Sequence, residues 1–241
     1  MSGPPFHIKA KKQDIAENVI AVGDPGRAKM LAELLDDARL VNEHRGFLIY
    51  TGIYKGKEIT IATHGIGCPS AAIVFEELGM LGAKRIVRLG TTGGMKPEME
   101  IGDVVIATGA VYPLGGCGVG MYLDGHCGPT APDPVLSTRI MDELDKEGIK
   151  YYYGPVFSSD AFYAEDPGFA KKWSEKGVIA VEMEAAILFT LGWMRGWSTA
   201  AVLIVSDNLL AEKQYLATSE ELRARIERVA KAIMDVYVKY Y

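Results

Sequence analysis

The fold is set by a ten-residue stretch near the start of the chain, Asn18-Val-Ile-Ala-Val-Gly-Asp-Pro-Gly-Arg27. The apolar residues 19–22 predict a buried strand, Gly23 ends it, and a helical pattern begins at Arg27. A strand that turns tightly into a helix is the layout of an anion site, because free backbone N–H groups at the helix start point at the ligand. Gly23 permits a close approach to the main chain, and Arg27 adds a forked positive charge. An ordinary strand-to-helix turn with a surface arginine has the same layout, so this stretch alone leaves both interpretations open.

The composition is that of a globular protein. The chain has 241 residues, of which 49% are hydrophobic and 24% charged, and no linker, repeat or low-complexity run divides it. We therefore predict a single domain over residues 1–241. The net charge of −5, with no basic cluster longer than residues 9–12, argues against nucleic acid as a partner. The chain start lacks a signal-peptide pattern, and no apolar run approaches the ~18 residues that span a membrane, so we expect a cytoplasmic protein with no membrane partner.

Strand patterns alternate with helical patterns along the chain. Further strands are predicted at 39–43, 47–54, 58–63, 85–89, 103–112, 151–157, 178–183 and 199–205. Helices are predicted at 27–35 and 69–81, after the cap Asp133, up to residue 194, and after the capping box at 218–221. The alternation predicts the α/β class with a central mixed β-sheet flanked by helices, mixed because residues 47–63 form a hairpin. The Gly-rich segment 113–132 predicts a functional or interface loop.

The chain contains three cysteines, Cys68, Cys117 and Cys127, which do not have the spacing of metal ligands. Cys117 and Cys127 flank the Gly-rich loop and can pair. Unpaired thiols are favoured in a cytoplasmic protein, with hyperthermophiles as the exception. We expect no metal site.

In an α/β sheet, ligands bind beyond the carboxyl ends of the strands. Arg27, Arg88 and Thr91 are expected there, together with glycine amides, and such a set suits a phosphate dianion. Arg88 can instead form a buried ion pair, since an unpaired buried arginine is costly.

Carboxylates follow two other predicted strands. Glu182 and Glu184 share one face if extended and can then accept hydrogen bonds from a ribose diol; equally, they can be the acidic start of a helix. Asp207 follows an apolar strand, where burial raises the pKa of a carboxyl and makes it a usable general acid, although a capping role is the alternative. His64, between Thr63 and Gly65, is expected to be structural.

Five motifs in this order resemble the nucleoside phosphorylase-I family, which includes bacterial purine nucleoside and uridine phosphorylases. They are Gly23-Asp-Pro-Gly-Arg27, Arg45-Gly46, Arg88-Leu-Gly-Thr-Thr-Gly93, Val181-Glu-Met-Glu-Ala185 and Ser206-Asp207. The resemblance extends from His7 to the last helix and is strongest to the branch of archaeal hexameric 5′-methylthioadenosine and purine nucleoside phosphorylases. It implies phosphorolysis of a purine nucleoside (inosine, guanosine, adenosine or 5′-methylthioadenosine) to the free base and (5-methylthio)ribose 1-phosphate.

The resemblance also implies roles for individual residues. Phosphate would be bound by Gly23, Arg27, Arg88 and Thr91, with Arg45 reaching in from a neighbouring subunit. The neighbour's His7 would lie by the sugar 5′ position. Met183 and Glu184, with Glu182 beside them, would contact ribose, Phe162 would pack on the base, and Asp207 would protonate or hydrogen-bond purine N7. Phosphate is then a co-substrate, no cofactor is needed, and the implied assembly is a homohexamer with sites shared between subunits.

Three alternative functions fit the sequence less well. Uridine phosphorylases read uracil with a glutamine and an arginine after the Phe-Tyr pair, whereas Phe162-Tyr163 is followed here by Ala-Glu-Asp, and they generally lack the acid matched by Asp207. A hydrolase of the same fold would not need three arginines for phosphate. A nucleoside-binding protein without activity would not need Asp207. The arginine that assists this aspartate in bacterial purine enzymes has Arg223 and Arg225 as its nearest candidates, and neither can be assigned from sequence.

Overall fold

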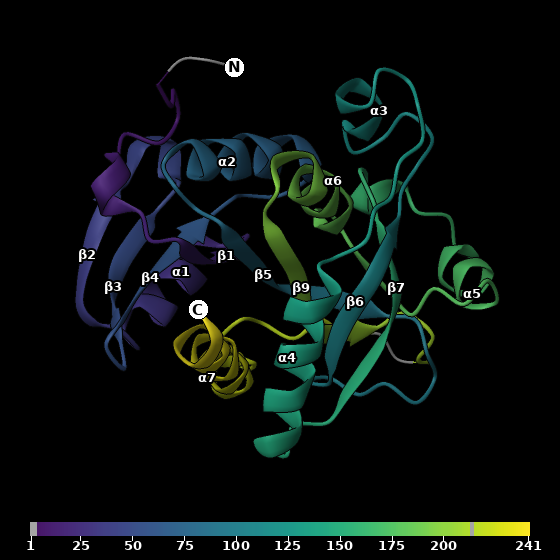
Figure 1. Ribbon diagram of the computed structural model, residues 1–241. Coiled ribbons are helices and arrows are strands. Elements are labelled where there is room, and N and C mark those ends of the chain that lie inside the picture. Colours follow the sequence, from purple (N-terminus) through teal and green to yellow (C-terminus); the bar gives the residue numbers. More distant parts are fainter. Residues whose placement is uncertain (1–3, 213–214) are drawn as a thin grey trace.

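The stretch from Asn18 to Arg27 lies at the centre of the molecule. A computed structural model describes residues 4–212 and 215–241 (Figure 1). Within them, strand β1 (Asn18–Val22) is fully buried and is followed by helix α1 (Pro25–Ala32). The helix starts two residues before Arg27, because the Asp24 side chain caps it by accepting a hydrogen bond from Gly26 N (2.8 Å) and Pro25 occupies the first helical position. Arg27 is therefore already in the first turn.

The described residues form a nine-stranded sheet in the order β2-β3-β4-β1-β5-β8-β7-β6-β9. Strand β9 also pairs with β5, so that β5, β8, β7, β6 and β9 close on themselves. The remaining strands are β2 (Asp36–Asn42), β3 (Ile49–Tyr54), β4 (Lys57–Thr63), β5 (Arg85–Gly94), β6 (Val104–Val111), β7 (Tyr151–Ser158), β8 (Ala180–Glu182) and β9 (Ser198–Asn208). Strand β1 runs parallel to β4 and β5, and the hairpin β3–β4 is antiparallel. The predicted α/β class with a mixed sheet is confirmed.

Helices cover both faces of the sheet. Helices α2 (Cys68–Met80) and α6 (Ala185–Arg195) pack on one face, and α1, α4 (Pro134–Lys146) and α7 (Arg223–Tyr240) on the other (Figure 1). Alternate residues of β1 pack against the two helix layers. Val19 and Ala21 face α2, and Ile20 and Val22 face α1. The short helices α3 (Val119–Tyr122) and α5 (Phe169–Ser174) lie outside these layers and were not predicted.

Two further predicted boundaries differ from the structure, the first of them for a tertiary reason. Strand β5 continues through the glycines at 90, 93 and 94, because β9 pairs with it along this whole stretch and supplies the backbone hydrogen bonds. The capping box forms, with Thr218 N donating to Glu221 Oε2 (2.8 Å), yet the α-helix begins only at Arg223. The Gly-rich segment 113–132 is irregular as predicted, apart from α3.

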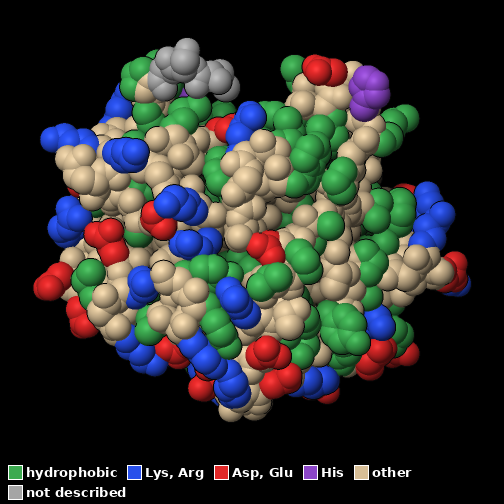
Figure 2. Space-filling view, in the orientation of Figure 1, with side chains coloured by type: hydrophobic (Ala, Val, Ile, Leu, Met, Phe, Trp, Pro, Cys, Tyr) green, Lys and Arg blue, Asp and Glu red, His purple; other side chains and the backbone are tan. Residues whose placement is uncertain are grey.

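The surface carries charges of both signs, interspersed over the face shown in Figure 2. None of the helices in the described part of the chain is long and apolar enough to cross a membrane. All three cysteines are unpaired: Cys68 and Cys117 are buried and Cys127 is exposed, so the pairing of Cys117 with Cys127 does not form.

Candidate active site

Three segments from the sheet meet at the carboxyl ends of β1 and β4. Val22 pairs with Thr63, and His64 N donates to Val22 O (2.8 Å), which places His64 beside Gly23. A Cβ on Gly23 would lie 3.2 Å from Gly65 O, so a larger residue would press on the neighbouring backbone. The parallel pairing of β1 with β5 brings Arg88 opposite Ala21. The first turn of α1 is therefore held against the ends of three parallel strands.

Arg27 is a buried cation without an anion. Its side chain is 6% exposed, its Nη2 donates to Ser219 Oγ (3.1 Å), and its Nε has no hydrogen-bond partner among the described residues. No described carboxylate lies within ion-pair distance of it. Burial, and then the charge of Arg88, lower the pKa of Arg27, while the charges of Asp24 and Glu184, which lie beyond ion-pair distance, offset part of that shift. A buried charge that lacks an ion-pair partner is destabilising, so this position favours an anionic ligand.

Arg88, in contrast, is fully paired. Its Nε donates to Glu182 Oε2 (3.0 Å) and its Nη2 lies 2.5 Å from Glu184 Oε2. Burial alone lowers the pKa of Arg88, but Glu184 and Glu182 outweigh that effect and raise it. The buried ion pair left open by the sequence is thus formed, and it joins one predicted phosphate ligand to two predicted ribose ligands. Arg88 can serve both roles, since a guanidinium has five N–H donors.

Unpartnered buried polar atoms gather at this same place. Among the described residues, five buried side-chain atoms lack a hydrogen-bond partner, and four of them belong to Arg27 (Nε), Thr63 (Oγ1) and His64 (Nδ1 and Nε2). Such atoms cost free energy unless a water or ligand satisfies them. Burial, and then Arg88, hold the pKa of His64 well below its usual value, so the ring is neutral near pH 7. His64 follows a predicted strand but is expected from the sequence to be structural, and its lack of hydrogen-bond partners is a tertiary observation.

The two glutamates lie at the end of β8 and the start of α6. Glu182 accepts hydrogen bonds from Ser158 Oγ (2.5 Å), Glu184 N (2.8 Å), Ala185 N and Arg88. Glu184 accepts from Gly67 N (2.6 Å) and pairs with Arg88, and burial is the main cause of its raised pKa. Glu182 is therefore saturated by the protein, whereas Glu184 keeps acceptor capacity.

Asp207 lies in β9 opposite Gly93 of β5, and it is half-buried. Burial raises the pKa of Asp207, and a hydrogen bond from Ser206 Oγ (2.9 Å) offsets part of that shift. Burial also raises the pKa of Glu165, to which the nearby Asp207 carboxylate adds. The structure thus places a second carboxyl beside Asp207 that sequence reasoning missed, although it directly follows the Phe162-Tyr163-Ala164 motif.

Of the remaining predicted site residues, one for phosphate and two for the sugar and the base are only partly enclosed. Thr91 and Met183 are half-buried, and Phe162 is 61% exposed on a 3-10 turn (Phe162–Ala164). Met183 also has its carbonyl oxygen bound by Cys68 Sγ (3.2 Å). Phe162 is therefore open to solvent within one subunit, and its contact with the base stays a prediction.

His7 and Arg45 are not part of this cluster. His7 Nδ1 lies 2.7 Å from Glu77 Oε1, and Arg45 is exposed with φ +60° and forms no ion pair with a described residue. The two residues share one surface, because His44 Nδ1 lies 3.0 Å from His7 O and Lys9 N donates to Asn42 Oδ1 (2.8 Å). Within one subunit, neither residue contacts Arg27 or Arg88.

The two candidates for an arginine that assists Asp207 lie elsewhere. Arg223 forms ion pairs with Glu33 and Glu227, and Arg225 lies beside Gly102. Neither contacts Asp207 among the described hydrogen bonds and ion pairs, so the role stays unassigned.

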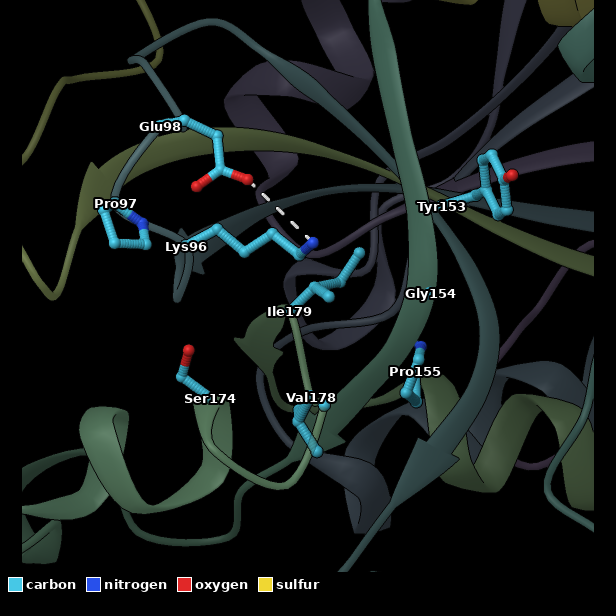
Figure 3. A pocket seen from close by; sticks show the side chains of 10 residues that line it. Lys96, Pro97, Glu98, Tyr153, Gly154, Pro155, Ser174, Val178 and Ile179 are labelled. Atoms are coloured by element: carbon cyan, nitrogen blue, oxygen red, sulfur yellow. Dashed lines mark ion pairs between the residues drawn. The ribbon is translucent and has the colours of Figure 1, made fainter.

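Open pockets between described residues include one beside Arg27 and one beside β7. One of about 490 Å³ lies beside Arg27, with Asp24, Ser219 and Arg223 in its lining. The other, of about 430 Å³, lies between β7, the end of α5 and the turn at residues 96–98 (Figure 3). Lys96 and Glu98 pair across 4.0 Å in that second pocket, which contains none of the predicted site residues. Of the predicted site residues, the first pocket contains only Arg27, and Glu33 and Glu220 line it as well.

Comparison with known proteins gives a consistent result. The model of the phosphorylase superfamily matches residues 17–240. The chain is 36% identical to a guanosine phosphorylase of Halorubrum lacusprofundi, covering 95% of this chain and 96% of that protein. It is 39% identical to a DeoD-type purine nucleoside phosphorylase of Exiguobacterium sp., covering 97% and 98%.

Solved structures show the same fold. A uridine phosphorylase of Vibrio fischeri superposes with a TM-score of 0.87 at 29% identity, covering 99% of this chain and 98% of that one. A purine nucleoside phosphorylase of Toxoplasma gondii in complex with immucillin-H superposes with a TM-score of 0.88 at 30% identity, covering 98% and 96%. Fold similarity alone therefore does not distinguish purine from pyrimidine.

Proposed function

Because the chain belongs to the nucleoside phosphorylase-I family of the phosphorylase superfamily, we propose that it cleaves purine nucleosides with inorganic phosphate. The products are the free base and ribose 1-phosphate, or 5-methylthioribose 1-phosphate when the substrate is 5′-methylthioadenosine. The enzyme is a pentosyltransferase, and phosphate is its co-substrate. It needs no cofactor, and a cytoplasmic location stays a prediction from the sequence.

The observation that carries this proposal is the buried Arg27 guanidinium without a carboxylate partner. A phosphate dianion bound there would satisfy its Nε and offset the repulsion from Arg88. Gly23 provides the approach to the main chain, and Thr91 supplies a hydroxyl from β5, whereas Gly26 N at the start of α1 is already bound by the Asp24 side chain. The unpartnered atoms of Thr63 and His64 beside this position support a polar occupant.

The ribose is held by Glu184 rather than Glu182. Glu182 already accepts four hydrogen bonds from Ser158, Arg88 and two backbone amides, so it positions its neighbours. Glu184 retains capacity to accept from a ribose diol, with Met183 next to it. Because Arg88 binds both carboxylates, the phosphate and the sugar are fixed relative to each other.

Asp207 is the acid in this mechanism. Breaking the N-glycosidic bond builds positive charge on the ribose and negative charge on the base. Phosphate stabilises the first charge and attacks C1′, while the Asp207 carboxyl protonates or hydrogen-bonds purine N7. Its raised pKa keeps the acid form available to a higher pH than usual. Packing of Phe162 on the base would exclude water and strengthen both interactions.

His7 and Arg45 act in the site of a neighbouring subunit. Their shared surface is exposed at Arg45 and separate from Arg27 and Arg88 in the same chain, which supports a role across an interface. In this proposal the assembly is a homohexamer, in which Arg45 reaches phosphate and His7 lies by the sugar 5′ position.

A purine is preferred over uracil. The residues after Phe162-Tyr163 are Ala164, Glu165 and Asp166, which do not provide the glutamine and arginine that read uracil. Asp207, with its raised pKa, suits a base that accepts a proton at N7. A comparison of inosine, guanosine, adenosine, 5′-methylthioadenosine and uridine as substrates tests this preference, and efficient cleavage of uridine alone would contradict it.

The decisive experiment measures release of base from inosine, adenosine and 5′-methylthioadenosine with and without phosphate. We expect release only with phosphate, and a large loss in the Asp207→Ala variant. Equal release without phosphate would show a hydrolase, and background release in both proteins would show a binding protein.

A further inference from the structure

Two buried cysteines lie side by side next to the proposed sugar site. Cys68 is the first residue of α2, and Cys117 lies in the Gly-rich segment 113–132. Their Sγ atoms and a carboxylate oxygen of Asp160 all lie within 4.8 Å of one another. Cys68 is 0% and Cys117 2% exposed, whereas Asp160 is exposed. The pair thus joins two segments that are about fifty residues apart in sequence.

Each thiol is held by a backbone carbonyl of the proposed sugar site. Cys68 Sγ donates to Met183 O (3.2 Å), and Cys117 Sγ donates to Ser158 O (3.6 Å). Cys117 N also donates to Asp160 Oδ2 (2.8 Å), which fixes the loop at this residue. The two sulfurs are therefore positioned toward each other by contacts outside the pair.

The buried surroundings of the two thiols favour an uncharged disulfide over a bound metal ion. The hydrogen bond with Cys117, and then burial, raise the pKa of Cys68, so the thiol keeps its proton. A divalent cation would require two buried thiolates near the carboxylate of Glu182. A disulfide is uncharged and removes two buried S–H groups.

We propose that Cys68 and Cys117 form a reversible disulfide that ties the Gly-rich segment to the start of α2 beside the nucleoside site. Glycines flank Cys117 at positions 115, 116 and 118, and Cys117 itself has φ +56°. This backbone can shift to bring the sulfurs to the ~2.0 Å of a disulfide bond.

The oxidant is a low-molecular-weight disulfide, and Asp160 is the exposed member of the cluster. The Cys117 thiol loses its proton, and its Sγ attacks one sulfur of the oxidant to form a mixed disulfide, while the other half of the oxidant leaves as a thiolate. Cys68 Sγ then gives up its proton as it attacks Cys117 Sγ, forms the Sγ–Sγ bond and expels the second small thiolate. Two protein S–H bonds and one small disulfide are consumed, and one protein disulfide and two small thiols are formed, which take up the two protons.

The test equilibrates the full-length protein with glutathione mixtures of increasing oxidised fraction, followed by denaturation, alkylation of free thiols and mass spectrometry. We expect wild type to go from three free thiols to one, with a crosslinked peptide that contains Cys68 and Cys117. The matched control Cys127→Ser should go from two thiols to none. Cys68→Ser and Cys117→Ser should form no internal bond.

A second readout is thermal unfolding. Because the bond closes a loop of about fifty residues, a reductant should lower the Tm of oxidised wild type and Cys127→Ser by roughly 5–15 °C. Three free thiols at the most oxidising mixture would overturn the proposal, as would a crosslink between Cys117 and Cys127. Protection of the pair by Cd²⁺ without oxidant, with no disulfide under oxidation, would show a metal site instead. If the serine variants do not fold, the wild-type peptide map alone decides.

Discussion

Arg88 Nη2 lies 2.5 Å from Glu184 Oε2, so the structure joins a residue predicted to bind phosphate directly to one predicted to bind ribose. Both side chains are buried, and Glu182 holds the same guanidinium from its Nε side. The neighbouring Arg27 has no such partner. Arg88 is thus held in place by the protein, whereas Arg27 is available to bind a ligand.

Arg27 should control the affinity for phosphate. We expect Arg27→Ala to lower kcat/KM for phosphate roughly 100-fold, because a charge-assisted contact to the reacting anion is lost. The KM for the nucleoside should change little. Steady-state kinetics with phosphate varied at saturating nucleoside measures this. Arg223→Ala is the matched control, since Arg223 lines the same pocket but is paired with Glu33 and Glu227, and it should stay within about two-fold. An equal loss in both variants would contradict the role of Arg27.

Asp207 should affect both the catalytic rate and the way in which stability depends on pH. Asp207→Ala is expected to lower kcat by about 10²–10⁴, the range for a lost general acid. Because burial raises the pKa of Asp207, the native state binds its proton more tightly than the unfolded state. Stability therefore falls as pH rises from the ordinary value of 3.8 through the raised pKa, and Asp207→Asn should remove that fall. Thermal unfolding of both proteins across pH measures it, and parallel curves would argue against a buried carboxyl.

His64 should make the folded protein less stable in acid. Burial and the nearby Arg88 lower its pKa in the native state well below 6.5, so the unfolded state binds the proton more readily. The contribution is constant above the unfolded pKa, and stability is lost as pH falls below it. His64→Phe should flatten the Tm profile below pH 6.5 and raise the KM for phosphate more than that for the nucleoside. An unchanged profile would show that His64 titrates normally.

Substitution of Glu184 should mainly affect substrate binding or turnover, whereas substitution of Glu182 should mainly affect stability. Glu184→Gln is expected to raise the KM for the nucleoside or lower kcat by roughly 100-fold, because it loses a contact to the ribose, and to lower the Tm less than Glu182→Ala does, because the glutamine keeps an oxygen that can accept from Arg88 and Gly67. Glu182→Ala should unfold more easily by about 3–5 kcal/mol, because Arg88 and Ser158 lose their buried partner. Denaturant unfolding and substrate kinetics on both variants separate the two effects. The reverse pattern would exchange their assigned roles.

Arg45 and Asp207 should complement each other between subunits. Arg45→Ala and Asp207→Ala are each expected to be nearly inactive alone. If sites are shared between two subunits, unfolding and refolding a one-to-one mixture should restore about a quarter of wild-type activity, since half of the pairs are mixed and one of their two sites is intact. No recovery, or a fully active monomer by sedimentation at assay concentration, would rule out a shared site.

Local sequence patterns were enough to predict most elements. The apolar run after Asn18, the cap Asp133 with Pro134, and the stripe of the last helix each depend on neighbours within a few residues. Where hydrogen bonds came from distant strands, the prediction was wrong, as at the glycines of β5 that pair with β9. The alternatives for Arg88, Glu182 and Glu184 stayed open for the same reason. A spacing of two residues does not show which groups lie next to the two carboxylates.

The sequence by itself determined the strand–turn–helix unit around Gly23 and Arg27, and the order of motifs that identifies the family. These depend on local backbone chemistry and on residue identity. Only the tertiary structure decided which charges are paired: Arg88 of β5 meets Glu182 and Glu184 at the end of the neighbouring strand β8, whereas Arg27 has no ion-pair partner and the ring nitrogens of His64 have no hydrogen-bond partner among the described residues. It also decided that Cys117 lies by Cys68 rather than Cys127. Burial and charge pairing depend on contacts between segments that are distant in the chain, and no local pattern records them.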